Sequence, residues 1–359
     1  MFPATIHGTD EGLRPRSSSA CKKHDKMKIV IDDKIPYIRE AVAAVTPDAV
    51  YMPGAAITAA DVRDADALIV RTRTRCDETL LGGSRVRFVA TATIGHDHID
   101  TRFLDRSGIA WTNCPGCNAA SVAQYVRSSL LLIARDFGLC LCRATIGVVG
   151  CGHVGSLVSA AAGELGMNVL VCDPPLGRTG FVQLDTIERE ADVITFHVPL
   201  TSSGRHATFH LADEAFFGRL ARRPFIINTS RGAVVDGDAL GAAIDRGMVR
   251  QAVIDTWEGE PEIDRALLDK VYIGTPHIAG YSADGKVNAD NMALAALCRF
   301  FGLVPPPPVV APPLPPGFVY TGDPLELYNP LTDSAALKSS PEAFERLRGD
   351  YPLRRETFR

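Results

Sequence analysis

The sequence lacks a strong excess of charge of either sign, and it lacks any long apolar run. Its 359 residues carry 38 basic and 42 acidic side chains, which give a net charge of −4. This balance gives no reason to expect nucleic acid or an acidic membrane surface as a partner. No stretch approaches the roughly 20 apolar residues that a membrane-spanning helix needs, so the sequence predicts no membrane segment.

The cysteines do not indicate a disulfide framework. There are nine, an odd number in a long chain, and several lie in apolar runs. This usage predicts free buried thiols in a reducing cytoplasm. Cys114-x-x-Cys117 could be a redox or zinc motif, but no second pair lies nearby to complete a zinc site. The adjacent residues of His96–Asp100 are also poorly placed to converge on one ion, and we therefore predict no metal.

The first 26 residues are predicted to be a disordered extension. They are polar, with three serines at 17–19, and they contain no apolar core of the kind that a signal peptide needs. The rest of the chain exceeds the size at which one hydrophobic core usually divides, so two or more domains are expected.

Apolar runs of strand length alternate with helix-like segments from Lys28 onward, which is typical of parallel β-sheets. The first series has strand candidates at Ile29–Ile31, Leu68–Val70 and Phe88–Ala92, with a helix at Tyr37–Val45. A long helix is expected at Ala119–Arg135. Six further strand candidates follow, at Ile146–Val149, Val169–Cys172, Val193–His197, Phe225–Asn228, Ala252–Ile254 and Val271–Ile273. The pattern predicts an α/β protein with two Rossmann-like, doubly wound parallel-sheet domains.

The end of the chain suggests three further pieces. Asn291–Phe300 is expected to be a helix that returns to the first domain, and the prolines that follow form a stiff linker. The remainder, with an amphipathic segment at Pro341–Leu347, is too small to fold alone and should dock on the body or on another subunit. The expected divisions are 1–26 (extension), 27–118 with 283–303 (substrate domain), 119–282 (cofactor domain), 304–317 (linker) and 318–359 (C-terminal module).

A glycine-rich turn predicts a dinucleotide site. Gly150-Cys151-Gly152-His153-Val154-Gly155 follows a strand candidate and opens a helix, which is the context that gives this fingerprint its meaning. The glycines allow a tight turn, a close approach of the pyrophosphate and close helix–strand packing, and the helix N-terminus offers free N–H groups. Asp173, at the end of the next strand, can accept hydrogen bonds from the ribose hydroxyls and would repel a 2′-phosphate. NAD is therefore expected rather than NADP.

Three later segments carry an arginine, a glutamate and a histidine at predicted strand ends. Arg231 can hold a substrate carboxylate with a planar, bidentate guanidinium. His277 can take up the proton of a hydroxyl group while hydride leaves the adjacent carbon. Glu260 can orient that histidine and favour its charged form. Each residue alone has an ordinary structural explanation, and their joint occurrence behind the fingerprint is what indicates catalysis.

The motifs Ser230-Arg231-Gly232, Glu258–Pro261 and Pro276–Gly280, in this order after the fingerprint, resemble those of the D-isomer-specific 2-hydroxyacid dehydrogenases. The resemblance runs from about Lys28 to Phe300. It implies NAD as the cofactor and Arg231, Glu260 and His277 as catalytic residues. The cofactor-binding residues it implies are Gly150, Gly152, His153, Val154, Gly155, Asp173, Val198, Thr229, Ser230, Arg231, Asp255 and Gly280.

Further segments narrow the resemblance to one branch of the family. They are Ile31–Tyr37, Val70–Thr74, Phe88–Asp100, Pro115–Ala119, Cys172–Pro175, His277–Tyr281 and, near the end, Phe344–Arg348, Tyr351 and Arg354–Glu356. This branch oxidises 4-phospho-D-erythronate to 3-hydroxy-2-oxo-4-phosphobutanoate in pyridoxal 5′-phosphate biosynthesis, as a homodimer that uses a C-terminal dimerisation module. It implies substrate contacts from Thr72, Thr93 and Tyr281. For the phosphate, our own prediction is Arg71 and Arg73, because two guanidiniums near a strand end can clamp a dianion.

Other assignments remain open on the sequence alone. A phosphoglycerate or hydroxypyruvate dehydrogenase would share the fold and the three catalytic residues. An NAD-sensing binding protein would share the fold, although retention of Arg231, Glu260 and His277 argues against it. A Rossmann enzyme of the S-adenosylhomocysteine type is disfavoured by the Glu-Pro and Pro-His segments.

Overall fold

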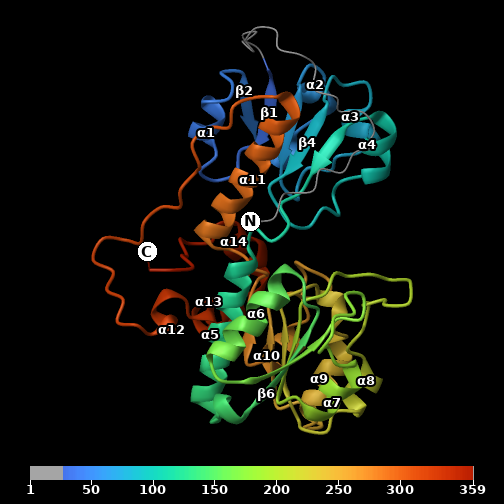
Figure 1. Cartoon of the computed structure of the whole chain (residues 1–359), viewed down its shortest axis with the longest axis vertical. Helices are drawn as coiled ribbons and strands as arrows, with labels where there is room; N and C mark the ends of the chain where they lie inside the picture. Colours follow the sequence, from blue (N-terminus) through green and yellow to red (C-terminus); the bar gives the residue numbers. More distant parts are fainter. Residues whose placement is uncertain (1–26, 359) are drawn as a thin grey trace. The chain divides into compact units, whose positions relative to one another are not determined.

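The computed structural model describes residues 27–358, and the predicted N-terminal extension therefore lies outside the described residues. The chain divides into two compact units, each built on one parallel β-sheet (Figure 1). Among the described residues, unit 1 comprises Met27–Asn118 together with Ala283–Pro313, and unit 2 comprises Ala119–Ser282 together with Leu314–Phe358. None of the described helices is long and apolar enough to span a membrane.

Unit 1 has a five-stranded sheet in the order β2-β1-β3-β4-β5, with every neighbouring pair parallel. Its strands are β1 (Ile29–Asp32), β2 (Ala49–Met52), β3 (Ala67–Val70), β4 (Phe88–Thr91) and β5 (Ala110–Thr112). Its helices are α1 (Arg39–Ala43), α2 (Ala59–Val62), α3 (Glu78–Leu81), α4 (Thr101–Ser107) and α11 (Ala283–Phe301). The strand order reverses between β1 and β3, so unit 1 is doubly wound, and ligands of such sheets bind at the carboxyl ends of the strands on either side of this point.

Unit 2 has a six-stranded parallel sheet in the order β11-β10-β9-β8-β6-β7, which reverses between β6 and β8. Its strands are β6 (Thr145–Val149), β7 (Asn168–Cys172), β8 (Val193–Phe196), β9 (Phe225–Asn228), β10 (Gln251–Ile254) and β11 (Ile273–Gly274). Its helices are α5 (Ala119–Phe137), α6 (His153–Glu164), α7 (Leu184–Glu190), α8 (Glu214–Gly218), α9 (Gly237–Asp245), α10 (Arg265–Lys270), α12 (Pro324–Leu327), α13 (Pro330–Ser339) and α14 (Phe344–Gly349).

Alternate residues of each strand enter two separate cores, as expected for a sheet covered on both faces. In β9, Ile226 packs with the apolar side chains of α7 to α10, whereas Ile227 packs with those of α5 and α6. The C-terminal residues contribute to both cores of unit 2, because Leu337 and Phe344 join the first and Tyr328 joins the second. The segment from Tyr328 to Phe344 is therefore packed onto the rest of unit 2.

Three predicted elements begin two or more residues from where they were expected. The helix expected from Tyr37 begins at Arg39, because Tyr37 has a φ of 65°, outside the helical region. The helix expected at Asn291–Phe300 begins eight residues earlier, at Ala283, and its first half was missed because it carries polar residues. The strand expected at Val271–Ile273 is β11 at Ile273–Gly274.

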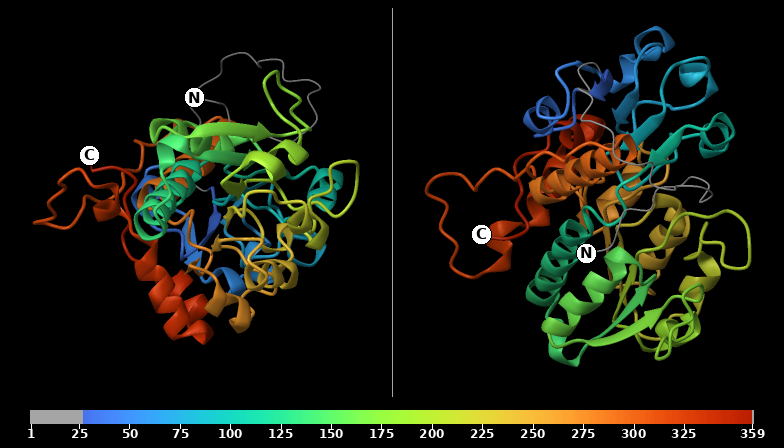
Figure 2. Two further views of the ribbon diagram at one scale, coloured as in Figure 1. Left: turned by 90° about the horizontal axis from the view of Figure 1, so that it is seen from below. Right: turned by 45° about the horizontal axis from the view of Figure 1, so that its top comes forward.

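The proline-rich segment after α11 contains no helix or strand before α12, and Figure 2 shows it as an extended strap. Asn291 of α11 holds this segment at Val309 with two hydrogen bonds. Its side-chain amide donates to the carbonyl oxygen of Val309 (3.0 Å), and its side-chain oxygen accepts from the amide of Val309 (2.8 Å). The strap is therefore anchored on unit 1 before the chain enters unit 2.

A buried carboxylate in α11 should make the stability of the protein depend on pH. Asp290 is 1% exposed, and its Oδ2 has no hydrogen-bond partner within residues 27–358. Burial raises its pKa to about 8, although the positive charge of Lys286 opposes the shift. Because the folded pKa lies above the unfolded value, the folded state loses stability as pH rises from about 4 to about 8.

Replacing Asp290 with Asn should therefore stabilise the protein increasingly with pH. We expect Tm to rise by about 5 °C or more at pH 9 and by only a degree or two at pH 5, since each unit of pKa shift corresponds to about 1.4 kcal/mol. Thermal unfolding across this pH range measures the effect. Asp105→Asn, on the exposed side of α4, is the control. A gain from Asp290→Asn that does not change with pH would contradict this explanation.

Candidate active site

The glycine fingerprint lies where the strand order of unit 2 reverses. Gly150 follows β6 with a φ of 90°, and a Cβ atom there would lie 2.5 Å from the carbonyl oxygen of His197, directly after β8. A Cβ on Gly155 would lie 1.9 Å from the carbonyl oxygen of Gly150, whereas a Cβ on Gly152 would meet only open space. The first and third glycines thus permit close packing, and the second leaves the backbone open to a ligand. His153 and Val154 begin α6, whose N-terminal N–H groups can bind a pyrophosphate.

Asp173 stands beside this turn at the end of β7. Its Oδ2 accepts a hydrogen bond from the amide of Cys151 (2.7 Å), and its Oδ1 accepts from the amide of Leu176 (3.1 Å). These bonds hold the carboxylate next to the fingerprint, where it fits a ribose diol and would repel a 2′-phosphate. The residues present therefore fit NAD.

Replacing Asp173 with Asn should weaken the preference for NAD. The substitution keeps an oxygen acceptor for the amide of Cys151 but removes the negative charge. We expect the ratio of NADH to NADPH affinity to fall about 10- to 100-fold, which corresponds to the 1–3 kcal/mol of a charge–charge term near a protein surface. Fluorescence titration with both reduced cofactors gives this ratio. An unchanged ratio would remove Asp173 from cofactor selection.

The ends of β8 and β9 carry further expected cofactor residues. Val198 lies against the fingerprint turn, since its Cγ1 would be 2.8 Å from a Cβ on Gly150. The hydroxyl of Thr229 lies 3.3 Å from Nδ1 of His197, and the hydroxyl of Ser230 donates to the side-chain oxygen of Asn228 (2.8 Å). His197 was missed by the sequence analysis. Burial lowers its pKa to about 3, so its ring is neutral at the end of β8.

The three predicted catalytic side chains lie together in unit 2. Arg231, Glu260 and His277 line one hollow of about 280 Å³, together with residues of the loops after β8, β9 and β10. Nδ1 of His277 lies 2.8 Å from Oε2 of Glu260. This pairing leaves Nε2 of His277 for a substrate hydroxyl, as the predicted role requires.

The charge of Glu260 is stabilised by its surroundings. Burial opposes ionisation, but the hydrogen bond and charge of His277, the amide of Trp257 and the charge of Arg348 outweigh it and lower the pKa of Glu260. The amide of Trp257 donates to Oε1 at 2.8 Å. Glu260 is therefore ionised at neutral pH and can orient His277 and favour its protonated form.

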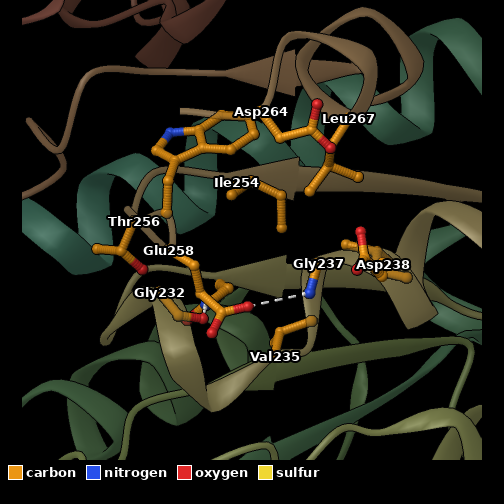
Figure 3. Close-up of a pocket in the computed structure, with 12 residues that line it drawn as sticks. Gly232, Val235, Gly237, Asp238, Ile254, Thr256, Glu258, Asp264 and Leu267 are labelled. Carbon is orange, nitrogen blue, oxygen red and sulfur yellow. Dashed lines mark hydrogen bonds between the residues drawn. The ribbon is translucent and has the colours of Figure 1, made fainter. Parts of the chain in front are cut away.

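Arg231 is held at the end of the loop after β9. Its Nη1 donates to the carbonyl oxygen of Ser230 (2.8 Å). Gly232 follows, and a Cβ there would lie 2.0 Å from the carbonyl oxygen of Trp257, so this loop lies directly against the segment that leads to Glu260. A second hollow, of about 160 Å³, shares Gly232, Trp257 and Glu258 with the first but contains none of the catalytic residues (Figure 3).

Asp255, expected at the nicotinamide end, is 1% exposed, and its carboxylate is used within the protein. Its Oδ1 accepts from the hydroxyl of Thr275 (2.6 Å) and the amide of Ile278 (2.8 Å), and its Oδ2 accepts from the amide of Ala279 (3.0 Å). The expected contact with the nicotinamide stays a prediction. These bonds hold the backbone of Ile278 and Ala279, between His277 and Gly280.

The expected substrate residues fall into both units. Arg71, Thr72, Arg73 and Thr93 belong to unit 1, and Tyr281 belongs to unit 2. Arg71 follows β3, and its Nε lies 3.5 Å from Oδ2 of Asp32 at the end of β1, so both stand where the strand order of unit 1 reverses. Arg73 is exposed.

Lys286 of α11 is a further cation near Arg71 that the sequence analysis missed. Burial lowers its pKa, the positive charge of Arg71 lowers it further, and Asp290 opposes the shift. Lys286 lies nine residues after His277 in the sequence. Only the fold brings it near Arg71.

The two segments that were considered as metal sites, Cys114–Cys117 and His96–Asp100, contain side chains that form hydrogen bonds within the protein. Sγ of buried Cys114 lies 3.4 Å from the carbonyl oxygen of Thr91 and 3.3 Å from that of Ala289, so its single S–H can donate to either. Burial raises the pKa of this thiol. His98 lies 3.0 Å from the hydroxyl of Thr91, and Asp100 caps α4. Within residues 27–358, no three His, Cys, Asp or Glu side chains are grouped as metal ligands would be.

Comparison with known proteins identifies the family. Residues 123–279 match the model of the D-isomer specific 2-hydroxyacid dehydrogenase NAD-binding domain. The erythronate-4-phosphate dehydrogenase of Bacteroides thetaiotaomicron is 54% identical, over 92% of this chain and 97% of that protein. The enzyme of the same name from Citrobacter koseri is 40% identical, over 92% of each chain.

Solved structures agree with this placement. The D-lactate dehydrogenase of Aquifex aeolicus, complexed with NAD and lactic acid, is 25% identical with a TM-score of 0.61, over 77% of this chain and 96% of that one. The NAD⁺-bound 3-phosphoglycerate dehydrogenase of Entamoeba histolytica is 25% identical with a TM-score of 0.65, over 77% and 95%. The chain therefore belongs to the D-isomer specific 2-hydroxyacid dehydrogenases, a family of NAD-dependent oxidoreductases, and within it to the erythronate-4-phosphate dehydrogenases.

Proposed function

We propose that the protein oxidises 4-phospho-D-erythronate to 3-hydroxy-2-oxo-4-phosphobutanoate, with NAD as the cofactor, as a step of pyridoxal 5′-phosphate biosynthesis. The observation that carries the reaction type is the Glu260–His277 pair in one hollow with Arg231. The choice of substrate is supported by relatives named erythronate-4-phosphate dehydrogenase that align over nearly the whole chain.

In the proposed reaction, the guanidinium of Arg231 binds the substrate carboxylate. Nε2 of His277 accepts the proton of the C2 hydroxyl as the C2–H bond breaks and the C2–O bond becomes a carbonyl. NAD supplies the hydride acceptor. Ionised Glu260 stabilises the imidazolium that forms and keeps its ring in place through the 2.8 Å contact with Nδ1. In the reverse direction, the same imidazolium donates the proton.

We propose that Arg71 recognises the substrate phosphate and that Lys286 adds a second cation, with Arg73 as the sequence-based alternative. The support is the position of Arg71 where the strand order of unit 1 reverses and the electrostatic contact of Lys286 with it. A dianion would relieve the repulsion between two half-buried cations. Thr72, Thr93 and Tyr281 remain proposed substrate contacts.

The single substitutions Arg71→Met and Lys286→Met should each raise KM for 4-phospho-D-erythronate about 100-fold, since truncating one partner of a desolvated ion pair costs 2–5 kcal/mol. KM for D-erythronate, which lacks the phosphate, should change only a few-fold. Steady-state kinetics on both substrates measure the difference, and Arg73→Met distinguishes the alternative pairing. Equal losses on both substrates would reject a phosphate site at these residues.

The proposed activity is tested by NADH formation from 4-phospho-D-erythronate, compared with D-3-phosphoglycerate and D-lactate. Turnover selective for the first supports the proposal. Turnover only with D-3-phosphoglycerate would favour the phosphoglycerate-type alternative. NAD binding without turnover of any of the three would favour an NAD-sensing protein.

We also propose that the protein is a cytoplasmic homodimer. Eight described cysteines are free, and six of them are buried, which suits a reducing compartment. The C-terminal residues remain the proposed dimerisation element. Light scattering of the purified protein tests the oligomeric state.

A further inference from the structure

The backbone after His277 is fixed by a buried carboxylate. Asp255 accepts hydrogen bonds from the amides of both Ile278 and Ala279, at 2.8 and 3.0 Å. These bonds hold the N–H groups of two successive residues that follow the predicted acid/base. They leave the two carbonyl groups of the same residues to be satisfied elsewhere.

A buried arginine from the C-terminal segment holds these carbonyl groups. Nη1 of Arg354 donates to the carbonyl oxygens of Ile278 (3.3 Å) and Ala279 (3.2 Å). Arg354 is only 4% exposed although it lies 77 residues beyond His277 in the sequence. Asp255 and Arg354 thus bind the N–H and C=O groups of the same two residues. We call this arrangement the loop clamp.

The other nitrogens of Arg354 tie the loop clamp to α5. Nη2 donates to the carbonyl oxygen of Ser121 (2.6 Å), and Nε donates to the side-chain oxygen of Gln124 (2.8 Å). The guanidinium carbon lies 3.6 Å from the ring centre of Tyr328, a cation–π contact. All three nitrogens are therefore used, in directions that a planar guanidinium provides and a lysine ammonium does not.

The residues around Arg354 reinforce this attachment. The side-chain carboxylate of Glu356 accepts from the hydroxyls of Ser121 (2.8 Å) and Ser282 (2.7 Å), which lie at the start of α5 and just after the catalytic loop. The side-chain amide of Gln124 donates to the carbonyl oxygens of Arg355 (2.9 Å) and Glu356 (3.3 Å). The end of the chain thus contacts the loop from Ile278 to Ser282 at several points.

The loop from Thr275 to Ser282, which carries His277, needs such support. His277 adopts a backbone conformation that residues other than glycine rarely take. Its φ is 56°, in the left-handed region. A non-glycine residue is strained there and persists only when its surroundings fix it. Loss of support would let the backbone relax and would change the direction of the imidazole relative to Glu260.

We propose that Arg354 is a positioning residue for His277, and that the C-terminal segment 351–357 is part of the catalytic machinery of its own chain. Arg354 touches neither substrate nor cofactor in this account. It acts through the backbone of Ile278 and Ala279, opposite Asp255. The proposal rests on the proposed role of His277 as the acid/base.

The test compares Arg354→Lys, Arg354→Ala and the unsubstituted full-length protein. We expect kcat to fall about 10- to 100-fold in the lysine variant and further in the alanine variant. Losses of this size are typical when a hydrogen-bond partner that orients an active-site side chain is removed, as in metalloenzymes. KM for NAD should change only a few-fold. Added guanidinium chloride at low millimolar concentration should restore part of kcat in Arg354→Ala but not in Arg354→Lys, where the ammonium fills the site.

Lys338→Met is the matched control for docking of the C-terminal residues. Its ammonium donates to the carbonyl oxygen of Val271 (2.5 Å), away from the catalytic loop. This variant should lose stability without a matching loss of kcat. If it loses as much kcat as Arg354→Lys at an equal drop in Tm, Arg354 only holds the C-terminal residues in place and the proposal is wrong.

Hydrogen–deuterium exchange of the peptide that covers residues 274–282 reports on the loop clamp without any turnover. We expect faster exchange of the Ile278 and Ala279 amides in Arg354→Lys, and unchanged exchange in the middle of α5. Unchanged exchange at the loop, or faster exchange with a kcat near that of the unsubstituted protein, would overturn the proposal. If the unsubstituted protein has no activity on 4-phospho-D-erythronate, the proposed function fails, and the exchange result still decides whether Arg354 holds the loop.

Discussion

Replacing His277 with glutamine should lower kcat about 1,000-fold or more while NAD still binds. A positioned general base contributes about 10²–10⁴ to the rate, and Nε2 of His277 is the group that we assign to the substrate proton. Glutamine can keep a hydrogen bond to Glu260 but cannot accept and return a proton near neutral pH. Steady-state rates, with NADH binding measured by fluorescence, separate chemistry from cofactor binding.

Glu260→Gln is the companion variant. Its kcat should fall less than that of His277→Gln, because the imidazole can still take up the proton without its carboxylate partner. The kcat of the double variant should be only slightly lower than that of His277→Gln alone, since the two residues act as a unit. A His277→Gln enzyme with kcat within ten-fold of the unsubstituted protein would remove His277 from the proton transfer.

The second large effect is expected at Arg231. Arg231→Gln should lower kcat/KM by several hundred- to several thousand-fold, because a carboxylate that loses its bidentate partner in a desolvated site costs about 4 kcal/mol. The loss should appear in KM as well as in kcat, since the carboxylate is bound in both the ground state and the transition state. Kinetics over a wide range of substrate concentration measure both constants.

Arg231→Lys tests whether charge alone suffices. A lysine ammonium cannot form the parallel pair of hydrogen bonds that a guanidinium makes, so most of the loss should remain. Arg222→Gln, an exposed arginine whose Nη1 lies 3.5 Å from Asp192, is a control that should retain activity. Recovery of nearly full activity in Arg231→Lys would indicate that Arg231 supplies charge and not carboxylate geometry.

The catalytic residues could be predicted because each one follows a strand, and the apolar residues of that strand are consecutive in the sequence. Glu260 and His277 follow β10 and β11, and parallel strands bring their carboxyl ends to one edge of the sheet. The motif order then identified the pair, which the structure joins at 2.8 Å. The fingerprint was equally local, because its three glycines and its helix are consecutive in the sequence.

Contacts between distant segments could not be predicted. Arg354 lies in a short polar stretch whose local pattern gives no reason to bury a guanidinium. Three of its four acceptors are backbone oxygens that any sequence offers, and the fourth is the side-chain oxygen of Gln124. Lys286 lay in the half of α11 that carries polar residues, so that half was not predicted to be helical. β2 was missed because its residues are only half-buried, and β5 because it has three residues. Their pairing with β1 and β4 becomes visible only in the complete sheet.

The most direct test of the proposed reaction uses 4-phospho-D-erythronate with deuterium at C2. We predict NADH formation that is slower than with the unlabelled substrate, deuterium recovered in the NADH, and loss of this transfer in His277→Gln. NADH without deuterium, or no oxidation of this substrate under conditions where the protein binds NAD, would contradict it.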